Sequence, residues 1–156
     1  MASRDVSGAT PLFIDTGPFY ARFVETAQRH DRTTAVFKAI GEGEAVYRPL
    51  YTSTYVLDEL ATLILSHRDH DGATAAVKRI RESPTTVIHP DKADFDRTCE
   101  QFFRYDDHEI SFTDHMSGVL AAERDIEHVF TFDPDHFRTL GFTAVPADTD
   151  DGETHD

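Results

Sequence analysis

The chain has 156 residues, 39% of them hydrophobic, and this size and composition predict one globular domain with its own core. Fifteen basic against 29 acidic residues give a net charge of −14, which argues against nucleic-acid binding by long-range attraction. Cys99 is the only cysteine, so an intrachain disulfide and a cysteine-based zinc cluster are excluded. No apolar stretch approaches the roughly 20 residues that span a bilayer, and we expect a cytoplasmic protein without membrane contact.

The basic residues are mostly arginines, since only Lys38, Lys78 and Lys92 are lysines. Few lysines and many acidic residues are typical of proteins adapted to high salt, in which surface self-repulsion is screened. We therefore expect an acidic, halophile-like surface. Contact with a nucleic acid would then depend on a metal ion or on a few arginines.

Strand and helix patterns alternate between two ends, 1–10 and 147–156, that we expect to be disordered. The pattern predicts, in order, a buried strand at 12–15, helices at 18–29 and 32–40, a strand at 45–52 weakened by Pro49, helices at 54–67 and 72–81, a strand at 85–89, helices at 92–105 and 114–124 (the latter with Thr113 as N-cap), a strand at 128–132, a helix at 134–140 and a strand at 142–145. This alternation predicts a three-layer α/β/α sandwich with a central, mostly parallel sheet of about four to five strands, formed by residues 11–146.

Four acidic residues lie at or near element boundaries: Asp15, Glu59, Asp114 and Asp133. Asp15 and Asp133 each follow a predicted apolar strand. Ligands of open α/β sheets bind beyond the carboxyl ends of the strands, so we expect these two aspartates to converge.

Each acidic residue also has an ordinary structural explanation. Asp15 and Asp133 could cap the helices that follow them, and Asp114 lies in a first helical turn, where negative charge is favourable. The helical wheel places Asp58 and Glu59 on opposite edges of one apolar stripe, so it does not choose between them.

Taken together, the four residues indicate a cation site. Carboxylates that pack together repel each other unless a cation neutralises them. Mg²⁺ and Mn²⁺ prefer oxygen ligands and commonly use one or two protein carboxylates together with water. Such a site is suited to phosphodiester hydrolysis, because the ion stabilises charge on phosphate oxygens and lowers the pKa of a bound water.

The stretches that carry these residues resemble the PIN-domain family, and within it the VapC-type toxin ribonucleases; the matching segments are 12–16, 55–64, 111–114 and 129–142. The resemblance spans about residues 11–146 and implies a metal-dependent endoribonuclease that forms a homodimer and is neutralised by an antitoxin protein. It selects Glu59 over Asp58 and gives a catalytic set of Asp15, Glu59, Asp114 and Asp133. Asp15, Asp114 and Asp133 would serve the metal, the first and second of them as direct ligands. Thr16, Thr113 and Asp135 would support the site.

Other functions remain open or are excluded. A housekeeping RNA-processing nuclease and a non-catalytic PIN-like binding module are the alternatives. Arg22 and Arg48 are weak candidates for RNA phosphate contacts, since a salt bridge is the commoner role of an arginine in an acidic chain. The histidines, of which His67 and His70 are spaced i,i+3, do not complete a zinc pattern. Neither a glycine-rich phosphate loop nor a nucleophile elbow is present in the sequence.

Overall fold

The structure, a computed structural model, describes residues 8–106 and 109–149. Within these residues, five parallel strands form one sheet in the order β3-β2-β1-β4-β5. The strands are β1 (Thr10–Ile14), β2 (Tyr47–Ser53), β3 (Thr86–Ile88), β4 (His128–Phe130) and β5 (Thr143–Val145). The helices are α1 (Thr16–Phe23), α2 (His30–Gly41), α3 (Thr54–His67), α4 (His70–Glu82), α5 (Lys92–Arg104), α6 (Phe112–Glu123) and α7 (Pro134–Thr139).

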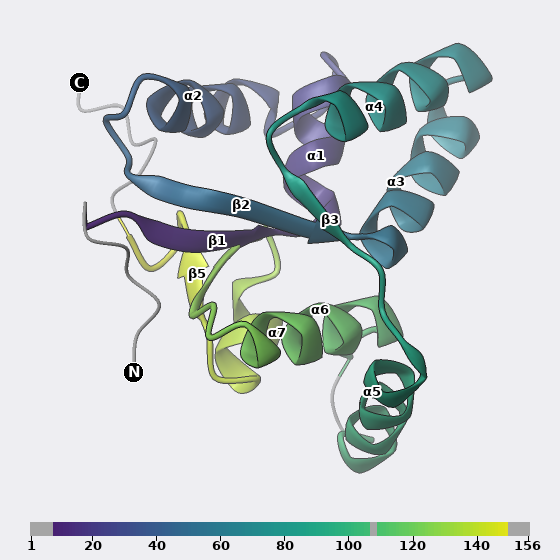
Figure 1. Ribbon diagram of the computed structural model, residues 1–156. Helices are drawn as coiled ribbons and strands as arrows, with labels where there is room; N and C mark the ends of the chain where they lie inside the picture. The colour runs from purple at the N-terminus through teal and green to yellow at the C-terminus, as the bar shows by residue number, and fades with distance from the viewer. Residues whose placement is uncertain (1–7, 107–108, 150–156) are drawn as a thin grey trace.

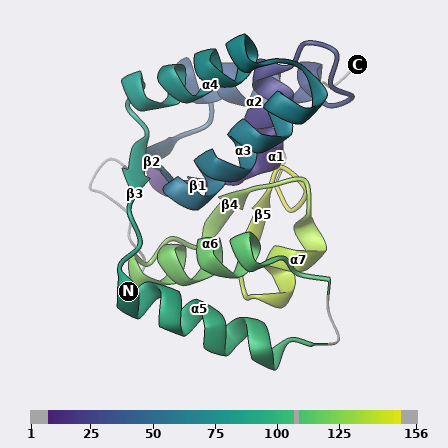
Figure 2. The same ribbon diagram turned by 90° about the vertical axis from the view of Figure 1, so that its right-hand side faces the viewer.

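The helices cover both faces of the sheet. Helices α1 to α4 lie on one face and α5 to α7 on the other, as Figures 1 and 2 show from two directions. The predicted three-layer α/β/α sandwich is therefore confirmed. None of the helices within the described residues is long and apolar enough to cross a membrane.

The central strands β1 and β4 carry buried apolar runs because helices cover the sheet on both sides. Leu12, Phe13 and Ile14 of β1 have no exposed surface, and neither do Val129 and Phe130 of β4. Strands of this kind are read from sequence as continuous apolar runs, which is why both were predicted close to their observed positions.

The order in which strands are added to the sheet reverses between β1 and β4. From β1 the chain passes through β2 to β3 toward one edge, and then returns to place β4 on the other side of β1. Ligands of open α/β sheets bind beyond the carboxyl ends of the strands at such a reversal, which here means the ends of β1 and β4. Asp15 follows β1 directly, and its backbone N–H donates to the carbonyl of Phe130, the last residue of β4, at 3.0 Å.

Two elements, the first helix and strand β2, differ from what the sequence predicts. The first helix ends at Phe23 instead of 29, because Val24 adopts an extended backbone and buries its side chain in the core. Strand β2 tolerates Pro49 because the pairing with β1 is irregular at that point, and an irregularity is where a sheet can accept proline.

The described residues include parts of both ends that were expected to be disordered. Ala9 is fully buried. The backbone N–H groups of Asp148 and Thr149 donate to the carbonyls of Ala144 and Pro146 at 2.8 and 3.0 Å. The remaining parts of the two predicted tails, 1–7 and 150–156, lie outside the described residues.

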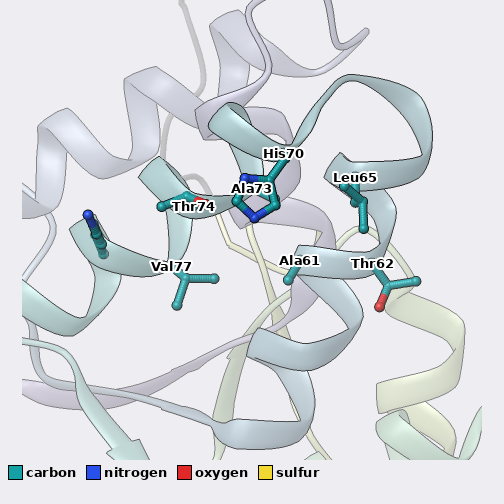
Figure 3. A pocket seen from close by; sticks show the side chains of 8 residues that line it. Ala61, Thr62, Leu65, His70, Ala73, Thr74 and Val77 are labelled. Atoms are coloured by element: carbon teal, nitrogen blue, oxygen red, sulfur yellow. The ribbon is translucent and has the colours of Figure 1, made fainter.

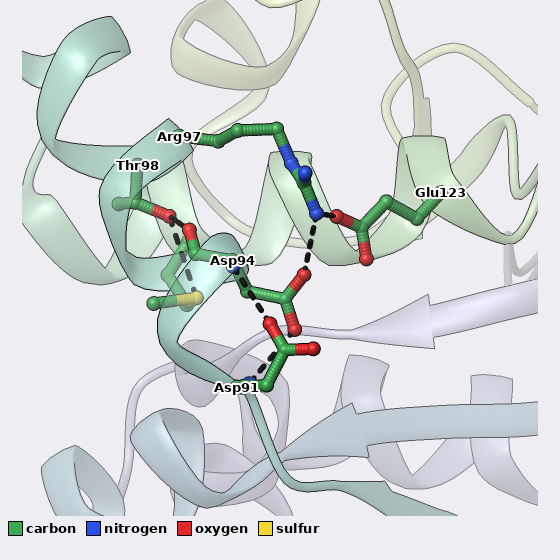
Figure 4. A network of polar contacts seen from close by, with 6 residues as sticks. Asp91, Asp94, Arg97, Thr98 and Glu123 are labelled. Carbon is green, nitrogen blue, oxygen red and sulfur yellow. Dashed lines mark hydrogen bonds and ion pairs between the residues drawn. The ribbon is translucent and has the colours of Figure 1, made fainter.

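A polar network fixes α6 against α5 (Figure 4). Asp91 and Asp94 form a reciprocal capping box at the start of α5. Arg97 then donates to Asp94 at 2.8 Å and pairs with Glu123 near the end of α6. Because α6 carries Asp114, this network helps to hold one acidic residue at its place beside the sheet.

Candidate active site

Asp15 is held at the end of β1 by a hydroxyl from the end of β4. Thr131 donates from Oγ1 to Oδ2 of Asp15 at 2.9 Å, and Oγ1 of Thr131 itself accepts a hydrogen bond of 2.9 Å from the backbone N–H of Asp133. Asp15 is only 3% exposed, and its Oδ1 has no hydrogen-bond partner among the residues that the structure describes. One carboxylate oxygen is thus anchored and the other is available.

Asp114 enters the site from the first turn of α6. The Ser111 hydroxyl accepts from the Asp114 backbone N–H at 3.1 Å and thereby caps this helix. Oδ2 of Asp114 lies 2.9 Å from Nδ1 of His136, which belongs to α7. Asp114 is 6% exposed, so its carboxylate is largely removed from water.

Glu59 and Asp133 complete the acidic group. Glu59 is half-buried on α3, whereas its neighbour Asp58 is exposed. The charge of Glu59 acts on Asp15, and the charge of Asp133 acts on Asp114. The structure thus brings together the four carboxylates singled out from the sequence.

The surroundings of Asp15 and Asp114 change the acidity of these two carboxyl groups. Burial, reinforced by the charges of Asp114 and Glu59, raises the pKa of Asp15 to about 8 against the bonds from Thr16 and Thr131 that lower it. Burial also raises the pKa of Asp114, the nearby Asp133 adds to this, and His136 and Ser111 act in the opposite direction. Carboxyl groups that resist ionisation in this way accept a cation readily, because the cation stabilises their charged form.

The capping explanation does not account for Asp15 or Asp133. Both occupy the N-cap position of a helix, α1 and α7 respectively, yet neither side chain makes a capping hydrogen bond. The prediction that Thr113 caps its helix was wrong. The helix begins earlier, at Phe112, and Ser111 is the N-cap because its hydroxyl reaches the free backbone N–H of Asp114.

The residues at this edge of the sheet fit a Mg²⁺ or Mn²⁺ ion. No three His, Cys, Asp or Glu side chains in 8–106 and 109–149 already form a closed ligand set. A hard divalent ion of this size does not need one, since it retains several waters and binds through one or two carboxylates. The unpartnered Oδ1 of Asp15 and the neighbouring buried hydroxyl of Thr16, also unpartnered among the described residues, are consistent with a ligand at this position.

The structure also places the other residues that were predicted to support the site or to contact RNA. Thr113 is half-buried next to Asp114. Asp135 points to solvent, with a side chain 92% exposed, and pairs with Arg138. Arg22 lies in the last turn of α1, whose first turn is at the site. Arg48 lies near the start of β2, at the amino-terminal ends of the strands, whereas the four carboxylates lie at their carboxyl ends.

Sequence reasoning missed two residues that contact the acidic group, Thr131 and His136. The signal for Thr131 is a lone hydroxyl at the end of an otherwise apolar strand pattern. His136 offers no local signal, because its contact with Asp114 crosses 22 positions and two helices. His115 is fully buried, with its ring against those of Phe102 and Tyr105, and burial lowers the pKa of its imidazole.

A separate groove of about 360 Å³ lies between α3 and α4 (Figure 3). It is lined mainly by small and apolar side chains, among them Ala61, Leu65, Ala73 and Val77. None of the four carboxylates lines this groove, so it is distinct from the acidic group.

The chain is similar to proteins of known family. The family model described as PIN domain matches residues 12–142, which is most of the chain. The chain therefore belongs to the PIN-domain family, and the resemblance noted from the sequence is confirmed.

Among curated relatives, the 23S rRNA-specific endonuclease VapC20 of Mycobacterium tuberculosis is 34% identical over 95 residues, which cover 60% of this chain and 71% of that protein. The crystal structure of VapC20, described as a sarcin-ricin loop cleaving toxin, matches with a TM-score of 0.74 and 25% identity over 85% of this chain and 96% of the other.

Two more distant structures share the fold. VapBC2 from Rickettsia felis, bound to a DNA fragment from its promoter, has a TM-score of 0.64 at 12% identity over 86% and 97% of the two chains. FitAcB from Neisseria gonorrhoeae has a TM-score of 0.59 at 14% identity over 85% and 95%.

Proposed function

We propose that this protein is an endoribonuclease that depends on Mg²⁺ or Mn²⁺ and acts as the toxin of a toxin–antitoxin pair. The observation that carries the proposal is the convergence of Asp15, Asp114, Glu59 and Asp133 beyond the carboxyl ends of β1 and β4. Membership of the PIN-domain family and the likeness to VapC20, named as a ribosomal RNA endonuclease, support RNA as the substrate.

Each carboxylate has a role that follows from its position. Asp15 and Asp114, the two most deeply buried of the four, would hold the ion. A bound Mg²⁺ or Mn²⁺ stabilises negative charge on phosphate oxygens and lowers the pKa of an attacking water. Glu59 and Asp133 are the more accessible members, and they would orient that water and accept its proton. Thr131 keeps Asp15 and the backbone of Asp133 in register.

The acidic surface makes the ion necessary for substrate binding as well as for chemistry. With a net charge of −14, the protein repels an RNA backbone at long range. A cation at the carboxylates would neutralise part of this charge where the scissile phosphate must approach. Arg22, which lies on α1 leading away from the site, could contact a flanking phosphate.

The toxin assignment implies two protein contacts. An antitoxin protein would neutralise the nuclease, and a homodimer would be its quaternary state. The crystal structure of VapC20, described as a toxin, supports the assignment by similarity. An RNA-processing role shares the same chemistry, and growth distinguishes the two: expression of a toxin should arrest cells, and co-expression of its cognate antitoxin should relieve the arrest.

The biochemical test uses two neighbouring residues of α3 as a matched pair. Glu59→Gln should reduce metal-dependent cleavage of large-subunit ribosomal RNA by about 100-fold or more, as expected for loss of a general base. Asp58→Asn removes one negative charge from the same turn of the helix and should leave cleavage unchanged. Equal effects of the two variants, or full activity of Asp15→Asn, would disprove the proposed assignment.

A further inference from the structure

His136 contacts the carboxylate of Asp114. Asp114 is buried and repelled by Asp133, so its side chain has few favourable partners. Oδ2 of Asp114 lies 2.9 Å from Nδ1 of His136. A hydrogen bond at this distance fixes the rotation of the carboxylate about its last side-chain torsion. Oδ1 then keeps one direction relative to Asp15.

The helix that carries His136 is short and needs an external anchor. Helix α7 has six residues, too few for stability by itself. Phe137 buries one side of it completely in the core. Its other attachment is Arg138, whose Nε donates to both carboxylate oxygens of Asp148, at 2.8 and 3.1 Å.

Asp148 is held in turn by the sheet. Its Oδ2 accepts a hydrogen bond of 2.9 Å from the backbone N–H of Ala144 in β5, and Arg138 donates to its Oδ1 through a second nitrogen as well. This bidentate pairing gives a defined geometry that a single surface ion pair would not provide. We call the contact between Arg138 and Asp148 the C-terminal clamp.

We propose that His136 is a positioning residue for Asp114 and that the C-terminal clamp, through α7, keeps His136 in place. The chain of contacts runs from β5 through Asp148, Arg138 and α7 to the carboxylate of Asp114. This inference rests on the proposed function, in which Asp114 binds the ion. Carboxylates and histidines that orient metal ligands in this way commonly change metal affinity by about 10–100-fold when they are removed.

Mn²⁺ binding to the metal-free protein, measured by calorimetry, tests the proposal without relying on activity. His136→Leu should weaken binding by about tenfold, because the Asp114 carboxylate becomes free to rotate. His136→Asn keeps an N–H donor close to the position of Nδ1 and should restore most of the affinity. His70→Leu and His70→Asn, at an exposed position of α4, serve as matched controls and should bind as the wild type does.

The clamp is tested by a double-mutant cycle. Asp148→Ala should weaken Mn²⁺ binding, although this residue does not contact the acidic group. If the clamp acts through His136, the double variant Asp148→Ala/His136→Leu should bind no more weakly than His136→Leu alone, since effects transmitted through one residue do not add. Asp96→Ala, which removes the exposed pair with Lys92, is the matched control. Thermal melting confirms that each variant is folded.

The outcomes separate this proposal from the proposed function. Wild-type protein that binds no Mn²⁺ would overturn both. If the wild type binds Mn²⁺ and His136→Leu binds it equally tightly, only the positioning role is overturned. Tighter binding by His136→Leu would show that the imidazole competes with the ion and would overturn the positioning role, as would failure of His136→Asn to restore affinity. Additive effects in the cycle would overturn the clamp.

Discussion

The hydroxyl of Thr131 bonds to the carboxylate of Asp15 at 2.9 Å, although 116 positions separate the two residues. The same oxygen accepts the backbone N–H of Asp133. One threonine therefore connects the two strand ends on either side of the point where the strand order reverses. This places two of the four acidic residues in a fixed relation to each other before any ligand is bound.

This connection predicts the effect of removing the hydroxyl. Thr131→Val keeps the shape and the strand preference of the side chain but leaves Oδ2 of buried Asp15 without its donor. We expect the free energy of unfolding to fall by roughly 1–3 kcal/mol, as for other buried groups left unsatisfied. Thr131→Ser retains the hydroxyl and should lose much less. Chemical denaturation of the metal-free proteins gives both values, and equal losses would contradict the role of the bond.

The acidity of Asp15 makes the stability of the metal-free protein depend on pH. Its pKa is about 8 in the folded state against an ordinary value of 3.8. Between these values the folded protein holds a proton that the unfolded chain releases, so stability falls as the pH rises from about 4 toward about 8. Below this range both states are protonated, and the penalty disappears.

Asp15→Asn removes this penalty and should therefore raise the stability of the metal-free protein. With a chelator present, we expect the variant to melt about 5 °C or more above the wild type near pH 8. The difference should shrink toward zero as the pH approaches about 4. Thermal melting across this range checks the prediction; a difference independent of pH would show that Asp15 ionises normally.

The same acidity predicts that ion binding releases a proton. At about pH 6 the Asp15 carboxyl is protonated, and it must ionise to coordinate a cation. Calorimetry of Mn²⁺ binding in buffers of different ionisation enthalpy should therefore report about one proton released per ion. At about pH 9 the release should be much smaller and the affinity higher. Proton release that does not vary with pH would exclude Asp15 as the ligand that ionises.

The sequence predicted the parts of the site that depend on local pattern. Asp15 and Asp133 follow apolar strands, and parallel strands bring their carboxyl ends to one edge, so their convergence followed from topology. Topology did not decide between Asp58 and Glu59, because the two lie symmetrically about one apolar stripe. Tertiary packing decides that only Glu59 is half-buried and acts on Asp15.

The sequence pattern did not predict contacts between elements that are distant in the chain. His136 reaches Asp114 only because α7 docks beside α6, and the docking depends on Phe137 and Arg138. The end of the first helix was misplaced for a similar reason. Val24 leaves the helix to fill the core, and helix propensity alone does not describe that gain.

The observed start of α6 leads to a last prediction, on the residue that presents Asp114 to the site. Ser111 accepts the Asp114 backbone N–H at 3.1 Å, whereas Thr113 lies inside the helix. Ser111→Ala should lower the free energy of unfolding by about 1 kcal/mol, since alanine cannot cap, and should weaken Mn²⁺ binding because the first turn that carries Asp114 frays. Thr113→Ala removes a hydroxyl two residues away and should leave the helix start intact. Denaturant melts and Mn²⁺ titrations of the two variants distinguish these outcomes, and a larger stability loss for Thr113→Ala would restore Thr113 as the cap.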